Sequence, residues 1–188
     1  MRDSLSPAVA RSRARVHRRG GPLHRVLIAR QTNVPELSDS AIRRAVRAAL
    51  APCRAGRVEV GVALLNGPSV RKLNARYLRR RGQTDVLAFD LSDRKDRSTG
   101  LLGEIVVNVE LARRRAARYR SPARSEIMLY ILHGCLHLVG YDDRDPAEAV
   151  RMHCREDDLL ERLGYGRTYT RVGEVPRSRQ RRHRLVRQ

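Results

Sequence analysis

HGCLHLVGYDD, at residues 133–143, is the stretch of sequence around which the rest of the fold is predicted. His133 and His137 are four residues apart, so on a helix they project from one face, one turn above the other. Gly140 can end that helix and reverse the chain, which would bring Asp143 to the two imidazoles. Three ligands and a free position for water are typical of a catalytic zinc site, whereas structural zinc sites usually have four ligands. The stretch therefore predicts a metal centre formed by His133, His137 and Asp143.

The residues before this stretch favour a buried helix. Ser121-Pro122 is typical of an N-cap followed by proline at the first helical position, and the segment from there to Gly140 is apolar almost all round. An alternative is that the two histidines are ordinary core residues with ordinary hydrogen bonds. The attached Gly-Tyr-Asp-Asp turn favours the metal centre.

Length and composition indicate one globular domain. The chain has 188 residues, of which 41% are hydrophobic, and no apolar run approaches the length of a membrane span. Its three cysteines are an odd and widely spaced set, so no disulfide framework is expected. We therefore predict a protein of the reducing cytoplasm with no membrane partner.

The net charge of +20 is carried almost entirely by arginine and predicts association with a polyanion, RNA or DNA. Both ends of the chain are rich in arginine and lack apolar periodicity. We predict a disordered basic arm at residues 1–22, a metallohydrolase domain at 23–170 and a disordered basic tail at 171–188. An organelle transit peptide is an alternative interpretation of the arm.

The hydrophobic pattern predicts an α+β fold, with a mixed sheet of four strands, about five helices packed on it, and the metal site at the end of a buried helix. The strands are expected near residues 23–29, 58–65, 84–90 and 101–109. The helices are expected near residues 38–50, 66–77, 109–119, 121–140 and 145–164.

Several separate stretches resemble the YbeY family, the bacterial rRNA maturation factors that are single-strand-specific metallo-endoribonucleases. The resemblance spans roughly residues 24–168 and is carried by residues 73–77, 84–89, 102–105, 133–142 and 152–165. It implies a metal-dependent endoribonuclease that acts at the 3′ end of 16S rRNA and in ribosome quality control. The implied partners are an rRNA precursor and the ribosomal subunit, with no DNA specificity.

The chain departs from the family pattern at two important positions. The family motif ends in a third histidine where this chain has Asp143, and Leu78 replaces an arginine that matters for nuclease activity in the family. We predict that Arg79 takes the catalytic role of that arginine, and that Arg76, Arg79, Arg80 and Arg81 bind RNA. A solvated loop is the alternative for residues 79–81.

An aspartate ligand is compatible with zinc, and it makes Mn²⁺ and Mg²⁺ more plausible occupants of the site. Asp142 is predicted to orient one of the histidines from outside the metal's own ligand set. His153 on the last helix is a spare ligand if Asp143 binds poorly. Gly134 stands where zinc proteases have the glutamate of His-Glu-x-x-His, which argues against peptide hydrolysis. A second hypothesis is a ribosome-associated RNA-binding factor whose metal site is structural or degenerate.

Overall fold

The computed structural model describes residues 24–53, 57–79, 82–92, 100–169 and 185–187. The predicted arm at 1–22, and residues 171–184 and 188 of the predicted tail, lie outside the described residues. The remaining tail residues, Leu185–Arg187, form a short strand. The division into an arm, a domain and a tail therefore stays a prediction.

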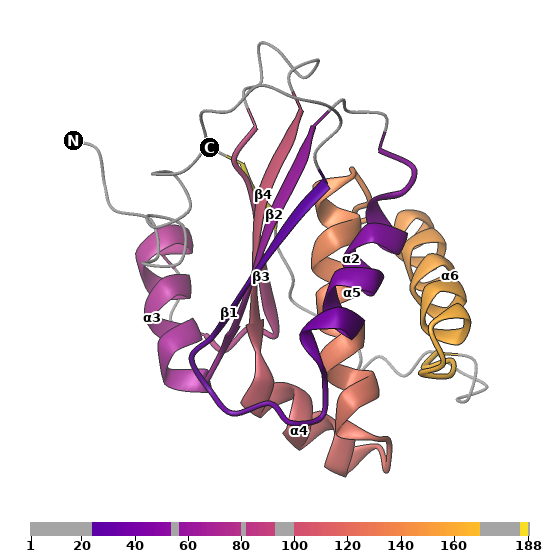
Figure 1. The fold of residues 1–188 in the computed structure, drawn as a ribbon. Coiled ribbons are helices and arrows are strands. Elements are labelled where there is room, and N and C mark those ends of the chain that lie inside the picture. Colours follow the sequence, from indigo (N-terminus) through magenta and orange to yellow (C-terminus); the bar gives the residue numbers. More distant parts are fainter. Residues whose placement is uncertain (1–23, 54–56, 80–81, 93–99, 170–184, 188) are drawn as a thin grey trace.

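A mixed β-sheet with the order β1-β2-β4-β3-β5 forms the centre of the molecule (Figure 1). Strands β1, β2 and β4 are parallel, β3 runs antiparallel to β4, and β5 pairs in parallel with β3 at the edge. Their bounds are β1 His24–Arg30, β2 Val58–Leu65, β3 Val86–Asp90, β4 Leu101–Asn108 and β5 Leu185–Arg187.

Five helices of the described residues surround the sheet, with bounds α2 Asp39–Leu50, α3 Gly67–Leu78, α4 Val109–Arg118, α5 Ala123–Leu138 and α6 Pro146–Arg162. Helices α2, α5 and α6 lie on one side of the sheet and α3 lies on the other (Figure 1). The predicted α+β fold, with four main strands and five helices, is confirmed; the three-residue β5 extends the sheet.

Polar side chains begin most of these helices as the sequence indicates. Ser38, Asn66, Asn108 and Asp145 each accept a hydrogen bond from a backbone N–H in the first turn of their helix. The prediction for α5 was wrong by one residue, because Pro122 rather than Ser121 occupies the N-cap. The carbonyl of Pro122 accepts the first helical hydrogen bonds, and no side chain caps the helix.

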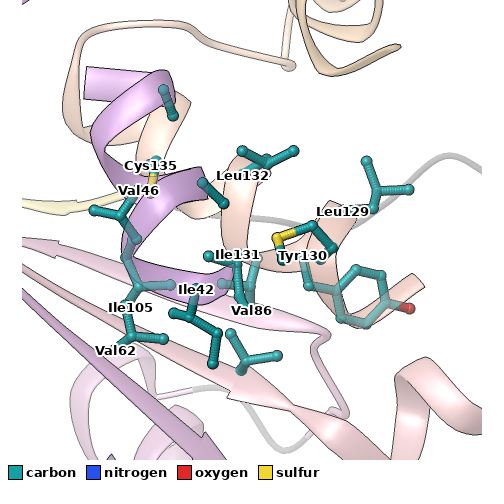
Figure 2. Packing of buried hydrophobic residues seen from close by; sticks show 14 of the residues in the cluster. Ile42, Val46, Val62, Val86, Ile105, Leu129, Tyr130, Ile131, Leu132 and Cys135 are labelled. Atoms are coloured by element: carbon teal, nitrogen blue, oxygen red, sulfur yellow. The ribbon is translucent and has the colours of Figure 1, made fainter. Parts of the chain in front are cut away.

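The main hydrophobic core lies between the sheet and the helices α2, α5 and α6. Figure 2 shows side chains of α2 and α5 packed over sheet residues that include Val62, Val86 and Ile105. Helix α5 is buried from Ser125 to Leu138, so its polar groups must find partners inside the protein. A smaller cluster lies under α3 on the other face. None of the helices in the described part of the chain is long and apolar enough to cross a membrane.

Candidate metal centre

The two histidines of the predicted centre lie near the C-terminal end of α5. His133 is fully buried and His137 is 3% exposed. Their ring centroids are 4.5 Å apart and the ring planes are nearly perpendicular, at 87°. Both side chains project from the same face of the helix, as the four-residue spacing predicts.

The chain reverses directly after α5. The Gly140 N–H donates to the carbonyl of His137 (3.1 Å) and the Tyr141 N–H donates to the carbonyl of Leu136 (3.0 Å), which satisfies carbonyls at the helix end. Gly140 has a φ of +100°, in the region that side-chain-bearing residues rarely adopt. The turn brings Asp143 back to the helix that it follows.

Asp143 meets both histidines through their Nε2 atoms. The distance from His133 Nε2 to Asp143 Oδ2 is 3.8 Å, and the distance from His137 Nε2 to Asp143 Oδ1 is also 3.8 Å. One ligand atom from each of the three residues lies within 4.8 Å of the others. Ligands of a tetrahedral zinc ion are about 3.4 Å apart, given zinc–ligand bonds of about 2.1 Å. The group can therefore hold one metal ion after only a small contraction.

The other nitrogen of each imidazole has its own partner. His133 Nδ1 is hydrogen-bonded to Glu156 Oε1 of α6, and His137 Nδ1 donates to the backbone carbonyl of Tyr141 at 2.9 Å. A carbonyl only accepts, so His137 carries a proton on Nδ1, and Nε2, the nitrogen nearer Asp143, is the atom left to bind a metal. This is the arrangement by which proteins present histidine to a metal.

Asp142 does not contact either histidine, and its carboxylate instead accepts hydrogen bonds from Arg144. These bonds lower the pKa of Asp142 to about 2. Asp142 was predicted to orient one of the histidines; the partners of their Nδ1 atoms in this structure are Glu156 and the Tyr141 carbonyl. Glu156 was missed, although a glutamate in helical phase with the buried Met152 and Leu159 is an unusual inward-facing charge.

His153, the predicted spare ligand, is not part of the group that can hold a metal. Its Nδ1 lies 3.1 Å from Glu156 Oε2, so it touches the same carboxylate as His133 from the other side. Its ring stacks on Tyr169, with centroids 4.1 Å apart and planes inclined by 20°.

The predicted RNA-binding arginines are not brought to the metal group by any contact of the described residues. Arg79 is exposed and ends α3 in the left-handed conformation, with φ of 51°. Arg76 is exposed and lies over the ring of Tyr77, 5.6 Å from its centroid. Helix α3 lies on the opposite face of the sheet from α5 (Figure 1). Arg80 and Arg81 lie outside the described residues.

Gly134 gives α5 its close contact with the sheet. A Cβ at this position would lie 2.6 Å from Ile105 Cγ2 and 3.1 Å from Val86 Cγ2. There is no room for the glutamate of a His-Glu-x-x-His protease motif. The helix face after His133 is used for packing, which agrees with the interpretation that the site does not hydrolyse peptides.

Comparison with protein families identifies the chain. The model of the family described as endoribonuclease YbeY matches residues 27–164, which include all three residues of the metal group. The chain belongs to the YbeY family. The resemblance predicted from the sequence is thereby confirmed.

Curated members of the YbeY family align with most of the described domain. An endoribonuclease YbeY from Anaeromyxobacter sp. is 36% identical over 132 residues, covering 69% of this chain and 68% of that protein. One from Myxococcus xanthus is 34% identical over 120 residues, covering 63% of this chain and 41% of the relative. This chain therefore spans less than half of the Myxococcus protein.

The solution structure of TM1509 from Thermotoga maritima has the same fold. It matches with a TM-score of 0.52 at 20% identity, and the match covers 74% of this chain and 91% of that one.

Within the YbeY family pattern, the position of the expected arginine is occupied by a packing residue. Leu78 is half-buried and packs against the cluster under α3. Gln83 of the following loop accepts a hydrogen bond from Arg114 of α4 at 2.9 Å, and the carbonyl of Gly82 accepts one from Asn74 at 2.7 Å. The loop before β3 is thus tied to both α3 and α4.

Proposed function

We propose that the protein is a metal-dependent endoribonuclease that cleaves single-stranded RNA during rRNA maturation, at the 3′ end of 16S rRNA, and in ribosome quality control. Membership of the YbeY family supports the endoribonuclease activity and its RNA substrate. The observation that carries the proposal is the convergence of His133, His137 and Asp143, whose ligand atoms lie within 4.8 Å of one another.

His133, His137 and Asp143 would hold the ion. The histidines contribute neutral nitrogen donors, since their Nδ1 atoms are engaged elsewhere, and Asp143 contributes an anionic oxygen. A divalent ion held by these residues would supply Lewis-acid chemistry, polarising a phosphate oxygen and lowering the pKa of a bound water toward neutrality. Three protein ligands leave the fourth position of a tetrahedral ion for a water or a phosphate oxygen.

We propose zinc as the ion, with Mn²⁺ or Mg²⁺ as alternatives. Two imidazoles and one carboxylate form a ligand set that zinc accepts. The anionic oxygen of Asp143 reduces the net charge of the site relative to a third histidine, which favours harder ions more than a three-histidine site would.

Arginines are proposed to hold the RNA. Arg76 and Arg79 are exposed on and directly after α3 and can contact phosphates, with Arg80 and Arg81 next in the chain. Arg79 is the proposed replacement for the family arginine at Leu78. The net charge of +20 supports a polyanionic partner, and an rRNA precursor within the ribosomal subunit is the one we propose, without specificity for DNA.

We propose a cytoplasmic location. Cys53, Cys135 and Cys154 are all free thiols, which is the usual state of cysteine in a reducing compartment.

A second function is an RNA-binding factor of the ribosome whose metal site is structural or degenerate. The observation in its favour is Leu78, which packs into the protein where the family pattern has an arginine. In this case the protein would bind RNA through its arginines and cleave none.

Cleavage and binding of one labelled single-stranded RNA separate the two functions. The metal-loaded parent is expected to cleave single-stranded RNA and to leave a duplex of the same sequence intact, and His137→Ala is expected to lose cleavage while still binding RNA. Asp158→Ala, at a 54% exposed aspartate of α6, is the matched control and should behave as the parent. Binding without cleavage by a fully metal-loaded parent would establish the second function instead.

A further inference from the structure

Glu156 is a fully buried carboxylate that lies between two imidazoles. Its Oε1 accepts from His133 Nδ1, and its Oε2 lies 3.1 Å from His153 Nδ1. A buried carboxylate is stable only when its oxygens are well hydrogen-bonded. Each oxygen therefore has an imidazole nitrogen as a partner.

We propose that Glu156 and His153 are positioning residues of the metal centre: Glu156 fixes the tautomer and orientation of His133, and His153 fixes Glu156. The inference rests on the proposed metal binding by His133, His137 and Asp143. It assigns a role to two residues of α6 that do not touch the ion.

Glu156 determines which nitrogen of His133 carries the proton that faces α6. A carboxylate accepts hydrogen bonds, so His133 carries a proton on Nδ1, and Nε2, the nitrogen nearer Asp143, is the atom left to bind a metal. His137 is fixed in the same tautomer by the Tyr141 carbonyl. The two histidines therefore have different supports, a charged side chain for one and a neutral backbone group for the other. A charged acceptor polarises the imidazole more strongly and makes it a better donor to a metal.

His153 holds the other oxygen of the Glu156 carboxylate. Its side chain is 17% exposed and lies one helical turn before Glu156 on the same helix. Its ring is held against Tyr169, whose backbone N–H donates to Asp157 at 3.1 Å. The ring is thus clamped at the chain segment after α6, with Nδ1 pointing to Oε2. A donor fixed in this place prevents the carboxylate from rotating away from His133.

Charge supports the same assignment. Asp143 and Glu156 both touch His133, one at each ring nitrogen. Two carboxylates with two neutral imidazoles balance the charge of a divalent ion. A site with three histidines and the same glutamate would retain one positive charge. Glu156 therefore matters for how strongly this chain retains a dication.

Metal affinity, measured by competition between the purified full-length protein and a chelator for Zn²⁺, tests the inference without RNA. Glu156→Gln is expected to weaken Zn²⁺ binding about 10- to 100-fold, the usual effect of losing such a partner. Glu161→Gln, the same change at a 57% exposed glutamate of the same helix, is the matched control and should bind as the parent.

Two variants of His153 separate positioning from packing. His153→Phe keeps a ring to stack on Tyr169 but lacks the donor, whereas His153→Asn keeps an N–H near the place of Nδ1 and lacks the ring. We expect His153→Phe to weaken Zn²⁺ binding about 10-fold and His153→Asn to stay within about 3-fold of the parent. Equal weakening by both, or no weakening by His153→Phe, would overturn the role of His153.

The tautomer can be observed directly. Nitrogen NMR of the His133 ring in the metal-free protein should show a proton on Nδ1, and a ring protonated on Nε2 alone overturns the role of Glu156. So does parent-like Zn²⁺ affinity in Glu156→Gln. A parent that binds Zn²⁺ with the expected Glu156 dependence but cleaves no RNA would remove the nuclease and leave the positioning residues in place. A parent that binds no divalent ion overturns the inference.

Discussion

Gly134 and Gly103, on the α5 side of the sheet, have less space around them than Gly61 on the other side. On the face covered by α5, a Cβ at Gly134 would lie 2.6 Å from Ile105 and one at Gly103 would lie 2.5 Å from Leu138, so the neighbouring side chain would have to shift. On the other face a Cβ at Gly61 would find its nearest neighbour, Glu104, at an ordinary 3.7 Å. The metal group is built on the tightly packed face. Close packing keeps the helix fixed, and a fixed helix keeps the ligands in place.

Buried acidic groups differ in the same way. Glu156, on the α5 side, has an imidazole at each oxygen. Glu104 of β4 is 4% exposed on the other side, and burial raises its pKa to about 7 from an ordinary value of 4.5. On the α5 side, Glu156 is hydrogen-bonded to His133 and His153. The pKa of Glu104 is instead raised because its carboxyl group is desolvated. Glu156 is thus buried beside the metal group with an imidazole at each oxygen, whereas burial dominates the pKa of Glu104.

The largest expected effect comes from Glu104. Its raised pKa means that the folded state resists ionisation, so the free energy of unfolding should fall as the pH rises from about 4.5 to about 7 and then level off. The pKa shift corresponds to about 3 kcal/mol. Urea unfolding of the parent and of Glu104→Gln at pH 5 and pH 8 measures it. The variant should lose most of this fall, while the exposed-site variant Glu161→Gln should retain it.

The next effect compares two glycine-to-alanine changes. Gly134→Ala forces a methyl group against Ile105, and overpacking of this kind costs about 1–3 kcal/mol, partly offset by the better helix propensity of alanine. Gly61→Ala has room and should change the unfolding free energy by no more than about 0.5 kcal/mol. Equal stabilities of the two variants in urea unfolding would break the contrast between the faces.

The ion pair between Arg113 and Glu36 at the surface should have the smallest effect on the free energy of unfolding. It serves as a reference for the effects of the buried carboxylates. Arg113 donates to Glu36, which lowers the pKa of Glu36. A lowered pKa stabilises the fold above the ordinary value of 4.5, and this contribution is lost as the pH falls through the folded-state pKa. Because both side chains are partly exposed, Glu36→Gln should cost below about 1 kcal/mol at pH 7 and nothing at pH 2. A larger cost at pH 7 would place this pair among the buried interactions.

Much of the fold was predictable because it depends on local patterns. Alternating and wholly apolar runs gave the four main strands, and glycine at position 140 predicted the turn that returns Asp143 to the histidines. Ser121 was a wrong N-cap because the extended Pro122 could take that position itself. The local patterns were adequate wherever the partner of a residue lay within a few positions of it.

The residues that hydrogen-bond to the metal ligands could not be predicted from local sequence patterns. Glu156 reaches His133 from another helix, 23 residues further along the chain, and only the packing of α6 on α5 brings them together. Asp142 is closer in sequence to the histidines, but Arg144 is closer still and binds it. Arg79 itself adopts the left-handed conformation that ends α3. No periodicity of the sequence indicates this conformation.

The amount of bound metal tests most directly whether His133, His137 and Asp143 hold one ion. The parent, Asp143→His and Asp143→Ala are loaded with Zn²⁺, dialysed against a weak chelator and analysed for bound metal per chain. We expect about one ion in the parent and in Asp143→His, and little metal in Asp143→Ala, because the alanine variant retains only two of the three ligands. Equal metal occupancy of the parent and Asp143→Ala would show that Asp143 is not a ligand of the metal.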